Sequence, residues 1–404
     1  MNDKKFWKGF GTGLLTFTTC LLLLILGTTL TGAVDWRQVL PGTKGSVLGA
    51  GMERKIREIQ AYVDIYYLDD VDQKEMEDSI CNGILEGLGD KYAAYYNEEA
   101  YEELTEKTSG NYCGIGAYVS QNATTGAITI IQPIEGSPAK KAGLQSGDII
   151  SRVDNKDISG KDLSEVVSLM KGEPGTKVKL QIVRADEKKP LDVTIIRAEI
   201  ESETVKYQML DGKIGYIGVS AFEEVTKEQF RGALDDLESR GQKSLIIDLR
   251  DNGGGLLATA VDMLDRMLPE GVVVYTKNKS GEKEEYYSDG KESFDKPVAI
   301  LVNENSASAS EVFSGAMQDY EKAALVGTTT FGKGIVQSVF DLSDGTAIKL
   351  TTSEYYTPKG RNIHGTGLEP DVRVELNDKL IKQTKSGLVM DNQLYSAMKY
   401  LKKK

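Results

Sequence analysis

Histidine and cysteine are scarce in this chain, which has one histidine and three cysteines among 404 residues. One imidazole and three thiols cannot build a histidine-rich zinc site, and a Ser-His-Asp triad would have to use His364. The cysteines form no Cys-x-x-Cys pair and no disulfide framework of even count. A histidine-rich metal centre is therefore excluded, and the cysteines carry no information on the redox compartment.

Basic charge is also in short supply, because 49 Lys and Arg face 61 Asp and Glu, a formal net charge of −12. This balance argues against a protein that binds a phosphate backbone, which needs a concentrated basic surface. Hydrophobic residues make up 40% and charged residues 27%, as is typical of folded soluble domains. At roughly 150 residues per domain, the length predicts two or three domains.

Charge is absent from one long segment near the N-terminus, Gly9–Val34. At about 1.5 Å per residue, a helix over this segment exceeds the ~30 Å hydrocarbon layer of a membrane. Three lysines precede it and a tryptophan lies at each end: Lys4, Lys5, Lys8, Trp7 and Trp36. The pattern predicts a transmembrane signal anchor within residues 1–34, with the remainder of the chain extracytoplasmic. A cleaved signal peptide, with small residues at 31–33, is the alternative.

Apolar residues at helical spacing follow a linker at 35–51. They recur every three or four residues on one face: Met52, Ile56, Ile59, Val63 and Tyr66. Two further helices are predicted, one that stops near Gly87 and one that begins at Asn97. Residues 52–107 thus form a predicted helical module, and its expected role is packing or homodimerisation.

From about Gly110 the pattern changes to short β segments, turns and one short helix near Leu163–Met170. Three segments resemble a PDZ domain of the circularly permuted bacterial kind: GIG at 114–116, SPAKKAGLQSGDIISRVD and LMKGEPGTKVKLQIVR. In such a loop, backbone N–H groups hold a peptide's terminal carboxylate while the peptide adds a strand beside it. The resemblance places a PDZ domain at 108–198, with peptide-binding residues Gly114, Ile115 and Gly116. A β-rich spacer without a ligand is the alternative.

Beyond Ile214 the chain alternates strands and helices. Two apolar strands are each followed by a helix, and these four elements are predicted at Ser244–Leu249, 256–268, Pro297–Val302 and 308–320. Alternation of this kind predicts an α/β core with parallel strands over 199–376, whose ligand sites lie at the carboxyl ends of the strands. Residues 377–404 are predicted as a C-terminal helical tail.

Three loops at predicted strand ends carry the candidate chemistry. Consecutive glycines in Asn252–Gly255 let backbone amides face a ligand, and no Gly-Lys-Ser/Thr ending marks a P-loop. Small residues at 303–311 open a helix, where free N–H groups favour negative charge, although an ordinary capping run also explains them. Lys333 lies between two glycines in an apolar neighbourhood. A lysine buried there loses its proton easily and can serve as general base toward a serine.

Together these loops resemble the carboxyl-terminal processing (tail-specific) serine peptidases over nearly the whole chain after the apolar segment. The motifs that carry the resemblance are LRDNGGGLL, SASASE, TFGKGIVQ and YYTPKGRNIHGTGLEPDV. It implies a crotonase-like α/β core with an inserted PDZ domain. It also implies these site residues: Ser308 as nucleophile, Lys333 as general base, Gln337 to orient the lysine, and the amides of Ala309 and of Gly253 or Gly254 as oxyanion hole. Family members often have Asn-Pro-Gly-Gly at 252–255, where this chain has Asn-Gly-Gly-Gly.

Two residues near these motifs have other expected roles. Ser306 is the second candidate nucleophile, and the resemblance implies a structural role for His364. The resemblance further implies that Leu169–Gly172 of the PDZ domain faces the catalytic core, with Lys171 as its gate. Relatives often carry arginine at that position, and lysine lacks the bidentate guanidinium.

The expected function is that of a serine endopeptidase anchored in a bacterial cell membrane with its catalytic part extracytoplasmic. It would bind the C-terminal tails of proteins or peptides through the PDZ domain and hydrolyse peptide bonds without metal or cofactor. No nucleic-acid partner is expected. Two alternatives stay open: a membrane-tethered PDZ adaptor with an inactive peptidase domain, and a signal-peptide-degrading Ser-Lys peptidase, which leaves the PDZ segment unexplained.

Overall fold

The structure of the chain is a computed structural model that describes residues 49–383 and 389–404. The predicted membrane segment, Gly9–Val34, lies outside these residues. Within the described ranges no helix combines the length and the apolar character needed to cross a membrane. The chain divides into two compact units, Met1–Met76 and Glu77–Lys404.

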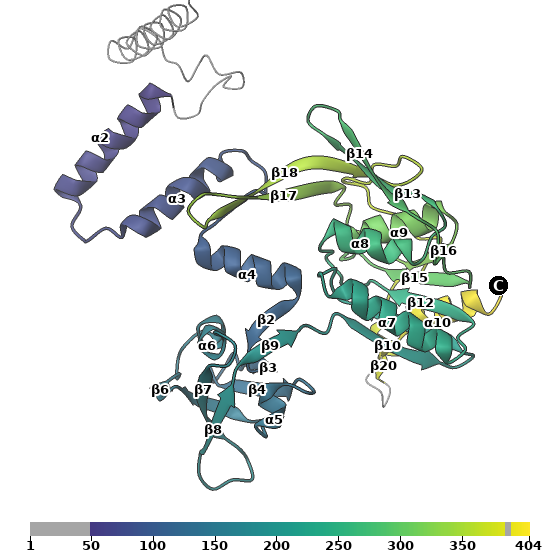
Figure 1. Ribbon diagram of the computed structural model, residues 1–404, viewed down its shortest axis with the longest axis horizontal. Coiled ribbons are helices and arrows are strands. Elements are labelled where there is room, and N and C mark those ends of the chain that lie inside the picture. The colour runs from purple at the N-terminus through teal and green to yellow at the C-terminus, as the bar shows by residue number, and fades with distance from the viewer. Residues whose placement is uncertain (1–48, 384–388) are drawn as a thin grey trace, which may run out of the picture. The chain divides into compact units, whose positions relative to one another are not determined.

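The described part of the first unit is helical (Figure 1). Helix α2 spans Ala50–Tyr66, and α3 spans Gln73–Glu86, across the boundary between the units. Both helices were predicted from apolar residues at helical spacing, and α3 ends beside Gly87 as expected. No residue of α2 is buried, and of the apolar face that predicted this helix Met52, Ile59 and Tyr66 are exposed.

In the second unit, the predicted PDZ region forms an antiparallel sheet of the order β3-β4-β5-β7-β8, with β6 paired to β5. The strands are β3 (Ala117–Gln121), β4 (Ile128–Pro133), β5 (Ile149–Val153), β6 (Lys156–Asp157), β7 (Lys177–Val183) and β8 (Leu191–Ile196). Two helices accompany them, α5 (Pro138–Lys141) and α6 (Leu163–Met170). Alternate residues of β7 are buried and pack with α6 in one apolar cluster, as period-2 patterning predicts.

The predicted α/β core contains a six-stranded sheet of the order β10-β11-β12-β15-β16-β19. Its strands are β10 (Val205–Leu210), β11 (Ile214–Val219), β12 (Ser244–Asp248), β15 (Val298–Val302), β16 (Ala323–Gly327) and β19 (Val372–Arg373). Only β10 is antiparallel to its neighbour. Every residue of β12, β15 and β16 is buried, which explains their near-continuous apolar sequences. The predicted α/β core is confirmed.

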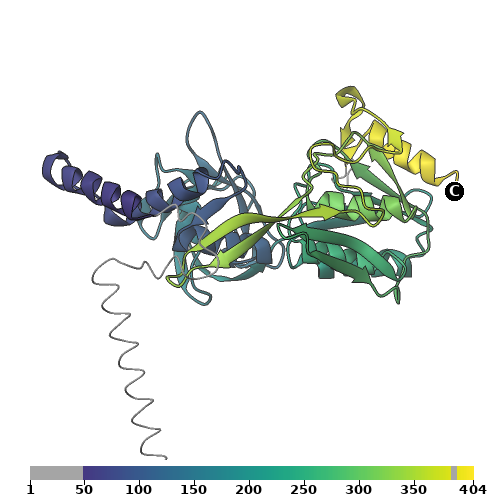
Figure 2. The same cartoon turned by 90° about the horizontal axis from the view of Figure 1, so that it is seen from above.

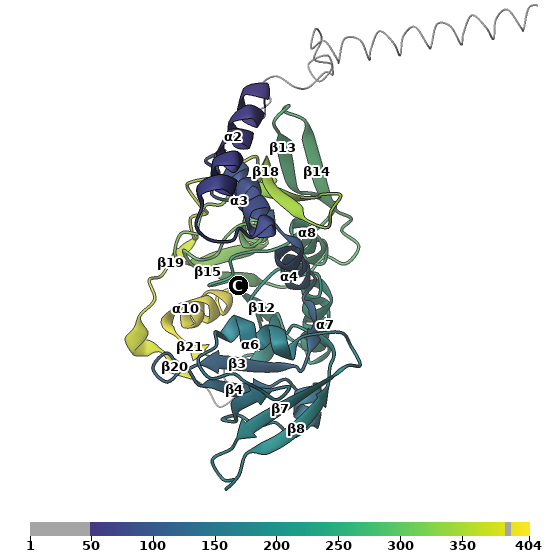
Figure 3. The ribbon, with the colours of Figure 1, turned by 90° about the vertical axis from the view of Figure 1, so that its left-hand side faces the viewer.

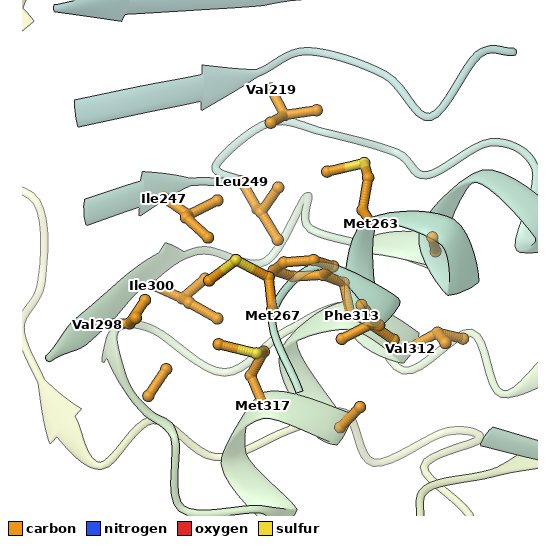
Figure 4. Packing of buried hydrophobic residues seen from close by; sticks show 14 of the residues in the cluster. Val219, Ile247, Leu249, Met263, Met267, Val298, Ile300, Val312, Phe313 and Met317 are labelled. Carbon is orange, nitrogen blue, oxygen red and sulfur yellow. The ribbon is translucent and has the colours of Figure 1, made fainter. Parts of the chain in front are cut away.

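Helices cover both faces of this sheet. On one face lie α7 (Thr226–Ser239), α8 (Leu257–Asp265) and α9 (Ala309–Asp319), which share a cluster with Ile247 and Ile300. Figure 4 shows part of this cluster, with Met263 of α8 and Phe313 of α9. On the other face lies α10 (Asn392–Leu401) (Figure 3). Its apolar side chains share a second cluster with Ile246 and Leu301, the alternate residues of β12 and β15. The predicted C-terminal tail is therefore an integral layer of the core. Before α10 the C-terminal tail also contains a short 3₁₀ turn (Asp378–Leu380) and the paired strands β20 (Lys382–Gln383) and β21 (Val389–Met390).

A second sheet contains β1, the strand that follows α3 in the chain. Its order is β1-β18-β13-β14, and β17 also pairs with β18. The bounds are β1 (Ala94–Tyr96), β13 (Gly271–Asn278), β14 (Lys283–Ser288), β17 (Ile335–Asp341) and β18 (Ala347–Tyr356). Figure 2 shows β17 and β18 as a long hairpin. The sequence did not predict β1, which continues through the Asn97-capped helix α4 (Glu98–Ser109) to β2 (Asn111–Gly114), the partner of β9 (Ala198–Glu201).

Candidate active site

Ser308 lies at the carboxyl end of β15, as the residue that precedes α9. Its side chain is half-buried and its backbone has φ 57° and ψ −116°, a conformation that residues with a Cβ rarely adopt. Gly254 is packed directly against it, and a Cβ at Gly254 would lie 2.9 Å from the Ser308 Cβ. Only glycine fits there, so the two predicted loops meet at Ser308.

A buried carboxylate joins the serine loop to the lysine loop. Glu311 is fully buried, and its Oε2 accepts the backbone N–H of Ser308 at 2.9 Å and that of Lys333 at 2.8 Å. Its Oε1 accepts the Thr330 hydroxyl at 2.6 Å and the Gly332 N–H at 2.7 Å. Four donors thus share one carboxylate, and the two loops cannot separate without leaving these donors unpaired in the interior.

Lys333 is half-buried two residues before β17. Burial lowers the pKa of its ammonium, and the nearby Lys349 lowers it further, against the opposing effects of Asp90 and Glu311. Its Nζ lies 4.5 Å from the centre of the Tyr92 ring. Within residues 49–383 and 389–404 no hydrogen bond joins this ammonium to Ser308, and Gln337 donates instead to the Thr351 hydroxyl at 3.3 Å. The predicted dyad residues are neighbours in the site but are not hydrogen-bonded in this arrangement.

The predicted oxyanion-hole donors differ in their bonding. The Gly254 N–H donates to Asn252 Oδ1 at 2.8 Å and is therefore engaged. A Cβ at Gly254 would lie 2.9 Å from the Ala309 nitrogen, so Ala309 adjoins this turn. In the described part of the chain the N–H groups of Gly253 and Ala309 have no acceptor. Of the three predicted donors, Gly253 and Ala309 are therefore the two whose N–H groups are available to a ligand in the described structure.

Ser306 and His364 have structural environments. Ser306 is fully buried, and its hydroxyl donates to the Leu249 carbonyl at 2.7 Å, which ties the serine loop to the end of β12. His364 is exposed, and a Cβ at Gly334 would lie 2.6 Å from its backbone nitrogen. The loop around His364 thus supports the lysine loop through its backbone, which agrees with the structural role expected of this histidine.

The PDZ groove has a volume of about 310 Å³. Its walls include the Gly114–Gly116 loop, Val119 of β3 and Met170 of α6. The N–H groups of Ile115 and Gly116 have no partner among the described residues, as a carboxylate-binding loop requires. Gly116 has φ 74°, and a Cβ there would lie 2.5 Å from the Ser137 Cβ, so this loop depends on glycine.

Helix α4 supplies a charged wall to the same groove. Its residues Glu103, Glu106 and Lys107 line the groove, and Glu106 forms an ion pair with Lys171, the predicted gate. Glu223 also lines it, with one carboxylate oxygen buried and without a hydrogen-bond partner. Burial raises the pKa of this carboxyl. Lys171 thus pairs with the helix that leads into the PDZ domain.

A hollow of about 910 Å³ is lined by neither Ser308 nor Lys333. Beside it Arg250 binds Asp248 at 2.7 Å and Asp391 at 2.7 Å, so it joins the end of β12 to the residue that caps α10. This cluster is a structural link between the sheet and the C-terminal helix. Among the described residues no group of histidine, cysteine and acidic side chains is arranged to hold a metal ion.

Three residues of the site were not predicted from the sequence: Glu311, Asp90 and Tyr92. Glu311 had a visible signal, because Ser-x-x-Glu at 308–311 is the pattern of a capping box at a helix start. Asp90 and Tyr92 had none, because only the pairing of β1 with β18 brings them to a lysine far along the chain.

Comparisons with known proteins show which family the chain resembles. Residues 213–374 match peptidase family S41, and residues 129–184 match a PDZ domain. The chain is 34% identical over 363 residues to the carboxy-terminal processing protease CtpA of Bacillus subtilis (strain 168), over 90% of this chain and 77% of that protein. It is 39% identical over 310 residues to a carboxy-terminal-processing protease of Bartonella bacilliformis, over 75% of this chain and 70% of that protein.

A solved structure from Bacteroides fragilis NCTC 9343, described as an S41 protease, covers 83% of this chain and 98% of its own. Its sequence is 18% identical and its TM-score is 0.51, so the likeness concerns the fold alone. The two bacterial relatives and the family match establish the relationship. The chain therefore belongs to peptidase family S41, the carboxyl-terminal processing serine proteases, and carries a PDZ domain.

Proposed function

We propose that this protease hydrolyses peptide bonds with a Ser308–Lys333 dyad. The observation that carries the proposal is the Glu311 carboxylate, which accepts the backbone N–H of both residues and so holds their loops together. The lowered pKa of Lys333 supports its role as base, because only a neutral amine can accept the serine proton.

In the proposed reaction, neutral Lys333 takes the hydroxyl proton as the Ser308 oxygen attacks a backbone carbonyl carbon. The Gly253 and Ala309 amides bind the oxyanion that forms. When the C–N bond breaks, the Lys333 ammonium returns the proton to the leaving amine. Water then attacks the acyl ester, and Lys333 passes the proton of that water back to Ser308. Gln337 orients the lysine after it has left Thr351.

The PDZ groove is the proposed site for the C-terminal tail of the substrate. A terminal carboxylate would accept bonds from the Ile115 and Gly116 amides, and the tail would extend along β3 past Val119. Because Lys171 at the groove pairs with Glu106 of α4, a bound tail can alter this ion pair. Lys171 is therefore the proposed gate between recognition and cutting.

Membrane anchoring and an extracytoplasmic location remain proposals that come from the sequence. They are supported by the uncharged segment Gly9–Val34 with its preceding lysines. Full-length protein should fractionate with membranes at its translated mass, and protease added outside the cell should digest its C-terminal part. A mature N-terminus near Val34 would instead show a cleaved signal peptide. Homodimerisation through the exposed apolar face of α2 is the proposed oligomeric state.

The dyad is tested with Ser308→Ala and Lys333→Ala in a peptide-hydrolysis assay. Each variant should lose at least about 10³-fold in rate at an unchanged unfolding temperature, because nucleophile and base act as a unit. Ser280→Ala and Lys279→Ala, exposed between β13 and β14, are the matched controls and should keep the full rate. Wild-type protein that binds tails but cleaves nothing would favour the inactive PDZ adaptor.

A further inference from the structure

The segment between α3 and β1 forms a wall of the lysine site. Asp90 Oδ1 accepts the backbone N–H of Tyr92 at 2.9 Å, a short turn that fixes the tyrosine backbone. Two residues later β1 pairs with β18, where Ala94 is opposite Lys349. The wall is therefore held at one end by its own turn and at the other by the sheet that carries the lysine loop.

Lys333 contacts this wall through its charged end. The Nζ lies 4.5 Å from the Tyr92 ring centre, a distance at which a ring face attracts a cation. A neutral amine gains little from the same contact, so the ring favours the protonated lysine. The other charged groups around the ammonium are Asp90 and Lys91 of the wall, Lys349 of β18 and Glu311 of α9.

Gln337 is directed to the same wall. Its amide donates to the Thr351 hydroxyl, and Thr351 in turn interacts with the Asp90 carboxylate, which lowers the pKa of Asp90. Both residues assigned to base chemistry thus contact the 90–92 wall or its immediate partner. In the described part of the chain neither forms a hydrogen bond to Ser308.

We propose that Tyr92 is a positioning residue that holds the protonated Lys333 away from Ser308, so that the segment Asp90–Tyr92 sets the resting state of the base. The proposal rests on the assignment of Lys333 as general base. Loss of the proton removes the attraction to the ring and frees the amine for Ser308.

The test compares the pH dependence of peptide hydrolysis in Tyr92→Leu, Tyr92→Phe and wild type. Leucine keeps an apolar neighbour but removes the ring, so the acid limb should shift to lower pH by about 0.4 to 1.5 units. At neutral pH the rate should rise by about 2- to 30-fold. Phenylalanine keeps the ring, so Tyr92→Phe should have the same acid limb as the wild type. Tyr395→Leu, an exposed tyrosine of α10, is the control and should leave the profile unchanged.

A second readout does not depend on turnover. In Ser308→Ala protein, the acylation of the Lys333 amine by a trace reagent is followed across pH by peptide mass spectrometry, with and without Tyr92→Leu. The pH midpoint of acylation should be lower with Tyr92→Leu, by the same amount as the shift of the acid limb. Asp90→Asn keeps the oxygen that accepts the Tyr92 N–H but removes a negative charge that favours the Lys333 ammonium. It should therefore also lower the pH midpoint of acylation. This second variant keeps the test valid if the leucine variant misfolds.

An unchanged or raised midpoint in both Tyr92→Leu and Asp90→Asn would overturn the proposal. An acid limb in Tyr92→Phe that matched Tyr92→Leu would also overturn it, because the ring would then not be the cause. If the proposed function itself is wrong, the experiments give a different result. Wild type would then hydrolyse nothing at any pH, while the amine titration would still report on the ring contact.

Discussion

Replacement of Glu311 by glutamine tests how the site is held together. The change keeps the size of the side chain but turns one of its oxygens into an NH₂ group. In the structure each oxygen accepts two bonds, from Ser308 and Lys333 on one side and from Thr330 and Gly332 on the other. Whichever way the amide is placed, NH₂ faces a pair of donors, and at least one N–H of that pair loses its acceptor.

The magnitude follows from the charged hydrogen bonds that are lost. A bond to an ionised group contributes about 1.5–3 kcal/mol, and the loss of two such bonds costs about 3–6 kcal/mol. That is a large share of the roughly 5–15 kcal/mol by which domains are stable. The unfolding temperature should therefore fall by about 10 °C, and hydrolysis should fall with it because Ser308 and Lys333 lose their common support.

The assay is thermal unfolding together with peptide hydrolysis, both measured on the full chain. Glu228→Gln is the matched control, because Glu228 is exposed in the first turn of α7 and should change stability by less than about 0.5 kcal/mol. A Glu311→Gln protein with wild-type stability and activity would refute the view that one carboxylate joins the two loops.

Three further predictions concern the PDZ region. A non-cleavable tail peptide with a free carboxylate should raise hydrolysis of a separate reporter, whereas its C-terminal amide should not, and equal rates would leave the groove as a tether. Burial opposes the ionisation of Asp148, but the hydrogen bonds that Arg184 donates outweigh burial and lower the pKa of Asp148. The stability that this ion pair contributes should therefore be lost as pH falls below about 4. Arg184→Ala should cost about 3–5 kcal/mol at pH 7, seen as faster hydrogen exchange in β5 and β7. The raised pKa of Glu223 means that its ionised carboxylate destabilises the folded protein, increasingly so as pH rises above about 4. Glu223→Gln removes this charge and should raise the melting temperature at pH 7 by a few degrees. A lower melting temperature in that variant would show that the carboxylate has a partner.

Most elements of the fold were predictable because their signals are local. The buried strands β12 and β15 read as apolar runs, α6 was predicted over Leu163–Met170, and Asn97 caps α4 as expected. The β13–β14 hairpin and β1 were not predicted. Their pairing with β18 depends on contacts between distant parts of the chain, which periodicity within one segment does not report.

The site divides in the same way. Ser308, Lys333 and Gln337 came from motifs, and the structure brings the loops of Ser308 and Lys333 together at Glu311. Motifs do not report how a side chain points. The contacts of Lys333 with Tyr92 and of Gln337 with Thr351 depend on the tertiary pairing of β1, β17 and β18.

The most direct test of the Ser308–Lys333 dyad is site-resolved labelling by a fluorophosphonate, read by peptide mass spectrometry across pH. The dyad predicts one modified residue, Ser308, with a labelling rate that rises with pH to a midpoint below the ordinary lysine value of ~10.4. It also predicts that Lys333→Ala abolishes labelling in protein that remains folded. Modification of a different serine, or an undiminished labelling rate in Lys333→Ala, would contradict the dyad.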